Sequence, residues 1–144
     1  MITVKQLLQN KGFDIWSVTP DTLIIDALKL MADKEIGALL VLDEAGKLMG
    51  IMSERDYARK IILQGKSSKT TAVGEIMTEK VVYVRPEQSV ETCMALMTSR
   101  NIRHLPVMEG GQLVGLISMR DVVGAIIAHQ EFIIEQLENY IAGR

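Results

Sequence analysis

The sequence is poor in the residues that build metal centres and disulfides. Among its 144 residues there are one cysteine, Cys93, and two histidines. A lone cysteine cannot form an internal disulfide, and no cysteine and histidine residues cluster at the spacing of a zinc site. We therefore expect no bound metal and a reducing compartment, the cytoplasm. Cys93 falls on the apolar face of a predicted helix, which favours a small buried side chain over a nucleophile.

Long apolar runs are also missing. No stretch approaches the roughly 20 residues of a membrane-spanning helix, and the N-terminus lacks the pattern of a signal peptide. Acidic and basic residues nearly balance, 18 against 16, for a formal net charge of −2. This balance gives no electrostatic reason to expect nucleic acid as a ligand. The polar ends of the chain lead us to expect a complete protein.

Catalytic motifs are scarce too. Neither His104 nor His129 has a nucleophile close to it in the sequence, and there is no glycine-rich phosphate loop. We therefore predict that the protein is not an enzyme. An enzyme that uses His104 as an acid or base is the weakest alternative, and a carboxylate that orients the imidazole would favour it.

The sequence does contain an internal repeat. A shift of 66 carries Pro20 onto Pro86, and after a one-residue deletion in a turn a shift of 65 carries 50–56 onto 115–121. A polar link at 64–71 joins the two copies. Two copies are too few for a solenoid, so a pseudo-twofold pair in which each half closes the core of the other is the more economical arrangement.

Each copy has the hydrophobic pattern of a β-α-β-β-α unit. The first copy predicts strands at 15–18, 38–42 and 48–52, a helix that ends near Gly37, and a helix from Ser53 towards Leu63. The second copy predicts strands at 82–84, 105–108 and 113–117 and two matching helices. We expect an α+β fold with two domains, 1–66 and 67–144.

The last predicted helix is longer than its counterpart in the first copy. It begins at Ser118 and extends to about Ile141, and it carries a stripe of isoleucine and leucine that one small domain is too small to cover. We interpret this stripe as a homodimer contact. The alternative is that the helix folds back over its own core.

The paired stretches 50–56 and 115–121 are the best candidates for a binding site. Each ends an apolar run with a serine, then places an arginine two residues later and an aspartate three residues later. One interpretation is a capping box, in which the aspartate reaches back to its own helix start. The other is a nucleotide site, because a helix N-terminus and an arginine suit phosphate and a carboxylate accepts from the two hydroxyls of a ribose. We expect the aspartates to point into a cleft.

Twin units with this motif resemble the cystathionine β-synthase (CBS) domain pair over nearly the whole chain. The resemblance implies two clefts between the repeats that bind adenine nucleotides, with AMP as the expected ligand and ADP, ATP or NAD as alternatives. It implies that the aspartates hold ribose and that the serines, with Arg103 and His104, approach phosphate. The site residues expected in this way are Ser17, Thr19, Ala38, Ser53, Arg55, Asp56, Thr78, Lys80, Arg103, His104, Pro106, Ser118, Arg120 and Asp121.

The two expected clefts differ in charge. The first copy has Gly37 and Ala38 where the second has Arg103 and His104. We predict a regulatory module that senses an adenine nucleotide, has no catalytic activity and forms a homodimer. The alternative is an assembly module without a physiological small-molecule ligand, whose protein partner the sequence does not name.

Overall fold

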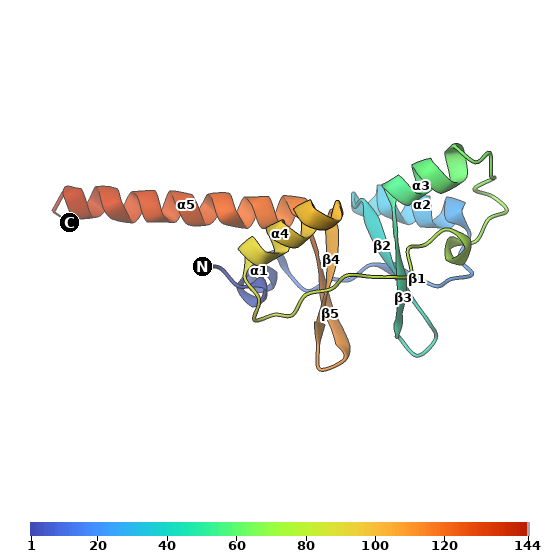
Figure 1. The fold of residues 1–144 in the computed structure, drawn as a ribbon, viewed down its shortest axis with the longest axis horizontal. Coiled ribbons are helices and arrows are strands. Elements are labelled where there is room, and N and C mark those ends of the chain that lie inside the picture. Colours follow the sequence, from blue (N-terminus) through green and yellow to red (C-terminus); the bar gives the residue numbers. More distant parts are fainter. Residues whose placement is uncertain (144) are drawn as a thin grey trace. The chain divides into compact units, whose positions relative to one another are not determined.

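The computed structural model describes residues 1–143 and divides the chain into two compact units (Figure 1). Unit 2 is Ile15–Val82, and unit 1 joins Met1–Asp14 to the chain from Tyr83 onward. The predicted domains, 1–66 and 67–144, are the two sequence repeats, and the compact units differ from them because Met1–Asp14 belongs to unit 1 and residues 67–82 belong to unit 2. Backbone hydrogen bonds explain the difference, because the N–H of Val4 donates to the carbonyl of Gln88 at 2.8 Å and the N–H of Ile24 donates to Thr71 at 2.9 Å.

Unit 2 is a three-stranded sheet covered by short helices. Strand β2 lies between β1, which is parallel to it, and β3, which is antiparallel. The buried core includes Ile24, Leu39, Met52 and Ile61. The elements are β1 (Ser17–Val18), α2 (Ile24–Lys34), β2 (Ala38–Leu42), β3 (Leu48–Ser53), α3 (Glu54–Tyr57), a π-helix at Ala58–Ile62 and a 3-10 helix at Val73–Glu75.

The helix predicted from Ser53 to Leu63 differs from the observed one. It is α-helical only for the four residues of α3 and then widens into the π-helix. Residues Ile62 and Leu63 at its end are exposed. A π-helix inside a helical segment is rare and makes a local change of direction.

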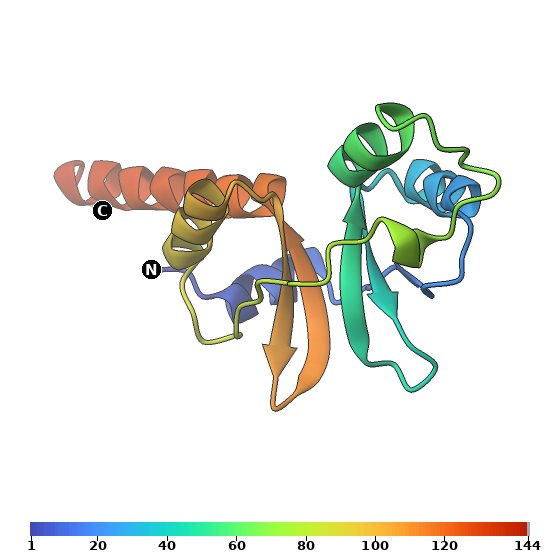
Figure 2. The ribbon, with the colours of Figure 1, turned by 45° about the vertical axis from the view of Figure 1, so that its right-hand side comes forward.

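Unit 1 combines a two-stranded antiparallel sheet with three helices, and Figure 2 shows its β4–β5 hairpin. Its core includes Leu8, Met97, Leu105 and Ile117, from four different elements. The elements are α1 (Val4–Lys11), α4 (Val90–Arg100), β4 (His104–Glu109), β5 (Gln112–Ser118) and α5 (Met119–Ile141). The prediction of a long last helix that begins at Ser118 is confirmed, with Ser118 as its N-cap.

The first strand of each repeat is shorter than predicted. In unit 1 the expected strand at 82–84 is a single bridge, in which the N–H of Val84 donates to Pro106 and the carbonyl of Val84 accepts from Met108. The next donor in a parallel ladder would be residue 86, and Pro86 has no N–H. Pro20 follows β1 at the same spacing in unit 2, so both repeats use a proline to end the pairing.

Helix α2 ends at Lys34, three residues before the Gly37 that was predicted to mark its end, and α4 ends at Arg100. Their C-cap residues, Glu35 with φ 54° and Asn101 with φ 53°, are both left-handed. In each helix the left-handed residue occupies the position where glycine is usually found. Asparagine tolerates this conformation better than glutamate does.

Candidate functional site

The same strand-to-helix turn is built twice. The serines that were predicted as site residues end β3 and β5, and each lies opposite the first residue of the neighbouring strand: Ser53 pairs with Ala38, and Ser118 pairs with His104. The first N–H group of α3, that of Glu54, donates to the carbonyl of Gly37 at 3.0 Å. The first N–H group of α5, that of Met119, donates to the carbonyl of Arg103 at 2.8 Å. The turn therefore brings Ala38 next to Ser53 in unit 2, and Arg103 and His104 next to Ser118 in unit 1.

The two aspartates turn back to their own helix starts. Oδ2 of Asp56 accepts from the N–H of Ser53 at 3.0 Å, and Oδ2 of Asp121 accepts from the N–H of Ser118 at 2.8 Å. The aspartate N–H groups donate in return to the serine hydroxyls, at 3.2 Å and 3.1 Å. Both motifs are complete capping boxes, so our expectation that the carboxylates point away from their helix starts is wrong. Unpaired N–H groups at a helix start attract the nearest acceptor.

Asp56 is enclosed by polar partners in unit 2. Its residue exposure is 8%. Besides the cap, its Oδ1 accepts from the hydroxyl of Thr78 at 3.2 Å and lies 3.1 Å from Nζ of Lys60. Lys60 also donates to the carbonyl of Ile76 at 2.8 Å. Both carboxylate oxygens of Asp56 are therefore engaged, and a ligand would have to displace one of these partners.

Asp121 is more open. Its side chain is 24% exposed, and Nζ of Lys11 lies 2.6 Å from its Oδ2. The same Nζ of Lys11 also donates to the carbonyl of Leu116 at 2.5 Å. In the part of the chain that the structure describes, the contacts of this carboxylate go to Oδ2. Burial alone raises the pKa of Asp121, but the hydrogen bonds from Lys11 and Ser118 outweigh it, so its pKa lies below the ordinary value.

His104 is half-buried, and the charges of Lys11 and Asp121 act on its imidazole. Burial, and then the nearby charge of Lys11, lower the pKa of His104 from its ordinary value of 6.5. The imidazole is therefore neutral at pH 7. Within residues 1–143 no carboxylate forms a hydrogen bond with it, so the structure adds no support for an acid–base role.

The other predicted residues fall into three environments. Ala38 and Pro106 are buried in their strands, whereas Ser17, Lys80, Arg103 and Arg120 are exposed. Thr19, also exposed, donates its hydroxyl to Asp21 and lowers the pKa of that carboxylate. Arg55 is half-buried in the first turn of α3.

The sequence interpretation missed Lys11 and Lys60. Lys60 had a local signal, because a lysine four residues after an aspartate is a common helical pair. Lys11 lies 110 residues from Asp121, and its only signal is that a shift of 69 carries it onto Lys80, a residue that was predicted.

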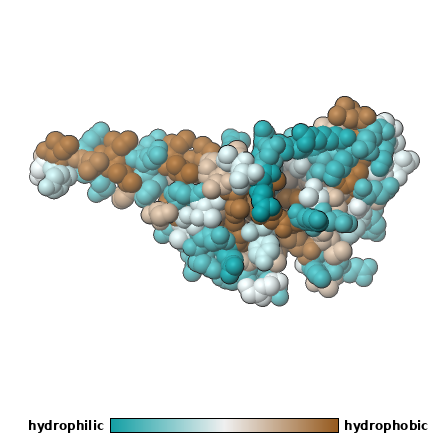
Figure 3. Space-filling view, viewed as in Figure 1, coloured by the Kyte–Doolittle hydropathy of each residue, from teal (hydrophilic) through white to brown (hydrophobic). Residues whose placement is uncertain are grey.

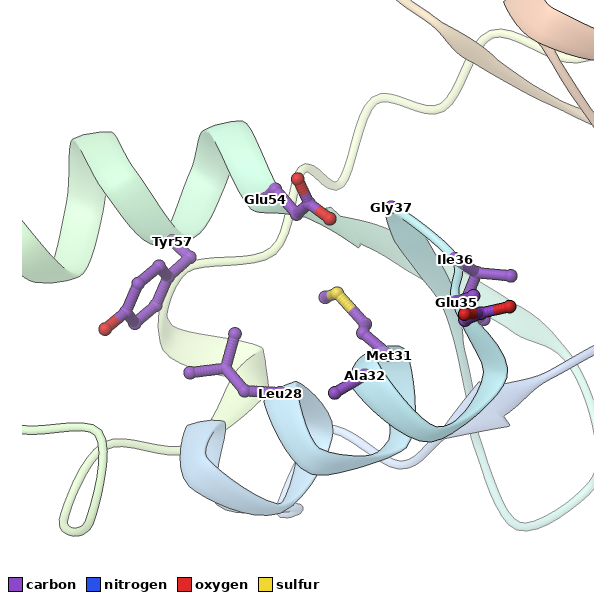
Figure 4. A pocket seen from close by; sticks show the side chains of 8 residues that line it. All are labelled: Leu28, Met31, Ala32, Glu35, Ile36, Gly37, Glu54 and Tyr57. Carbon is purple, nitrogen blue, oxygen red and sulfur yellow. The ribbon is translucent and has the colours of Figure 1, made fainter.

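A separate pocket of about 510 Å³ lies between α2 and α3 in unit 2 (Figure 4). Its floor is apolar, and the close-up shows the side chain of Met31 directed into it and the ring of Tyr57 at one end. Its charged side chains are the carboxylates of Glu35 and Glu54. This charge is the wrong sign for phosphate, so the pocket is a poor site for a nucleotide. Its lining residues are Leu28, Met31, Ala32, Glu35, Ile36, Gly37, Glu54 and Tyr57.

Two further properties of residues 1–143 bear on function. No described helix is long and apolar enough to cross a membrane. The described histidine, cysteine, aspartate and glutamate side chains form no group of three or more that could hold a metal ion.

Comparison with known proteins identifies the family. The CBS domain matches twice, at residues 4–63 and 73–128. The mitochondrial CBS domain-containing protein CBSX3 of Arabidopsis thaliana is 42% identical over 98% of this chain and 72% of its own length. Several longer curated relatives are matched over about a quarter of their length.

Solved structures agree. A putative signal-transduction protein with CBS domains from Burkholderia ambifaria is 55% identical, with a TM-score of 0.85 over 89% of this chain and 96% of that one. The CBS domain pair of protein MJ0100, solved with 5′-methylthioadenosine and S-adenosyl-L-methionine, is 25% identical, with a TM-score of 0.79 over 90% of this chain and 98% of that one. The chain belongs to the CBS-domain family and is a tandem CBS pair.

Proposed function

We propose that the protein is a regulatory module that binds an adenosine-containing ligand and has no catalytic activity of its own. The observation that carries the proposal is the duplicated turn, which places a helix N-terminus, a serine and an aspartate together in each repeat. The MJ0100 pair, of similar fold, was solved with two adenosine-containing ligands. AMP is the ligand we favour, with ADP, ATP and NAD as alternatives.

The second repeat is the better candidate for occupancy. Lys11, Arg103 and Arg120 bring positive charge to the region of the Ser118 turn, and the N-terminal end of α5 adds the positive end of its dipole. Oδ1 of Asp121 remains able to accept from a ribose hydroxyl. In the first repeat, Thr78 and Lys60 already take Oδ1 of Asp56.

The test is a thermal-shift titration followed by calorimetry. The panel holds adenosine, methylthioadenosine, AMP, ADP, ATP and NAD, with GMP as the control for the base. A ligand that binds the native state raises Tm by linkage. We expect Asp121→Ala to abolish the shift and Asp56→Ala to leave most of it, each compared with its own unliganded Tm. No shift with any adenine compound at millimolar concentration would overturn the proposal.

The second candidate function is assembly without a physiological ligand. It is favoured by α5, whose C-terminal half is almost entirely exposed and includes Ile133, Ile134, Leu137 and Ile141. We propose that these side chains form a homodimer contact. A structural relative, the CBS-CP12 protein of bloom-forming cyanobacteria, is hexameric. A stable dimer that binds none of the compounds above would favour this function. The compartment we propose is the cytoplasm.

A further inference from the structure

Helix α5 carries an uncovered apolar stripe along most of its length. Its first turns pack on α4 and α1 in unit 1, with Val122 buried. The stripe itself stays open, because Val123 is 37% exposed, Ile127 49%, Ile134 55% and Ile141 83%. Figure 3 shows hydrophobic surface along the part of α5 that extends beyond the rest of unit 1. The eighteen steps from Val123 to Ile141, at 1.5 Å each, make the stripe roughly 27 Å long.

The stripe has the spacing of a coiled-coil seam. Ile127, Ile134 and Ile141 recur every seven residues, and Val123, Gln130 and Leu137 form a second row with the same period. In heptad terms the first row is position a and the second is position d. A strict seven-residue repeat is the pattern of a left-handed two-stranded contact between helices. This repeat identifies another helix with the same pattern as the occupant.

We propose that the stripe pairs with α5 of a second copy in a parallel coiled coil, in register, so that Gln130 of one copy faces Gln130 of the other. The inference deepens the homodimer contact proposed above and rests on it. It adds the direction and register of the two helices.

Two features favour the parallel direction, and the first is the position of Gln130. Isoleucine at a with leucine at d, as at 134 and 137, favours two strands and does not decide their direction. In a parallel pair the two Gln130 amides meet and can hydrogen bond to each other, whereas an antiparallel register sets Gln130 against an isoleucine and buries its amide unpaired. A single polar layer of this kind also sets the register.

The second feature is the charge beside the seam. Glu131 and Glu138 both occupy position e. In an antiparallel pair e faces e, so glutamates come together and repel one another. In a parallel pair e faces g of the partner helix, and the g positions here are Ile126, Ile133 and Tyr140. The parallel arrangement therefore avoids the repulsion.

Cysteine cross-linking of the full chain tests the direction. The native Cys93 is fully buried and burial raises the pKa of its thiol to about 11, so it gives little background. We expect Leu137→Cys to give a disulfide dimer under mild oxidation. Gln136→Cys, on the outer side of the same helix turn, should stay monomeric on a denaturing gel. Cross-linking in a mixture of Ile127→Cys and Leu137→Cys without homodimers of Leu137→Cys would show an antiparallel pair and overturn the inference.

Light scattering separates this inference from the dimer contact on which it rests. Ile134→Asp places a charge in the seam, and Phe132→Asp places the same charge roughly 200° around the helix, on the opposite side. We expect a dimer mass for the parent and for Phe132→Asp, and half that mass for Ile134→Asp with unchanged helical circular dichroism. A monomeric parent would overturn both the contact and its geometry. A dimer that Ile134→Asp leaves intact would overturn the seam.

Discussion

The ammonium group of Lys11 lies 2.6 Å from Oδ2 of Asp121, and it donates at the same time to the carbonyl of Leu116. The contact ties the C-terminal end of α1 to the last residues of β5 and the first turn of α5. Asp121 also caps α5 by accepting from the N–H of Ser118. Lys11 therefore stabilises the N-terminal end of α5. It also occupies the carboxylate that we propose as the ribose acceptor.

Replacing Lys11 with methionine should lower the free energy of unfolding by about 1 kcal/mol. The two side chains are 34% and 24% exposed, so solvent weakens the ion pair, and the lost hydrogen bond to a carbonyl adds to the loss. Chemical denaturation measures the difference. Lys5→Met, at an exposed position of the same helix, is the matched control and should change the stability by less than half as much.

The loss from Lys11→Met should depend on pH. The pKa of Asp121 in the folded protein lies below its ordinary value of 3.8. A lowered folded pKa gives stability that is present above the unfolded pKa and is lost as the pH falls through the folded one. The parent and Lys11→Met should therefore differ at pH 7 and converge below pH 3.8. A difference that is constant from pH 7 down to acid unfolding would assign the effect of Lys11 to packing alone.

Asp56→Ala should cost about 2 kcal/mol of unfolding free energy. The substitution removes the capping acceptor of α3 and leaves Lys60 and the hydroxyl of Thr78 without their acceptor. Asp33→Ala, at an exposed position of α2, removes the same charge and should change the stability by less than 0.5 kcal/mol, as surface changes usually do. Equal losses would show that general charge, and not the enclosed network, stabilises unit 2.

Equivalent glycines in the two repeats should respond differently to alanine. A Cβ at Gly50 would lie 2.8 Å from the carbonyl oxygen of Thr78, which is backbone, whereas at Gly115 it would lie 2.9 Å from the methyl groups of Leu8. Overpacking costs roughly 1–3 kcal/mol. We expect Gly50→Ala near the upper end and Gly115→Ala near the lower end, because the leucine side chain can rotate. Thermal unfolding of both variants measures the order, and the reverse order would contradict the explanation.

The architecture was predictable from the sequence because the patterns that specify it are local and occur in both repeats. The repeat, the buried strands and the cap at Ser118 are readable from spacing alone. The compact units were not readable in this way. Their boundaries depend on which segment donates hydrogen bonds to which, as when Val4 bonds to Gln88, and such long-range pairing leaves no periodic pattern.

The duplicated turn was predictable from the sequence, but the orientation of its aspartate side chains was not. The spacing of Ser53 and Asp56 identified both the capping box and the nucleotide motif, and the same atoms serve either role. What decided the orientation was the set of partners around each carboxylate. Lys11 is 110 residues away from Asp121 in the sequence, and no local pattern around Asp121 predicts this contact.

Exchanging the two residues that end α2 and α4 should change stability in opposite directions. Glu35 and Asn101 both adopt left-handed backbone angles, which cost about 1 kcal/mol for an ordinary side chain and less for asparagine. Glu35→Asn should therefore raise the free energy of unfolding by up to about 1 kcal/mol, and Asn101→Glu should lower it by a similar amount. Urea denaturation of the two single variants and of the double variant measures both changes. Because the two positions lie in different units, the double variant should come close to the parent. A loss of stability in Glu35→Asn would show that the glutamate side chain at the rim of the pocket contributes more than its backbone strain costs.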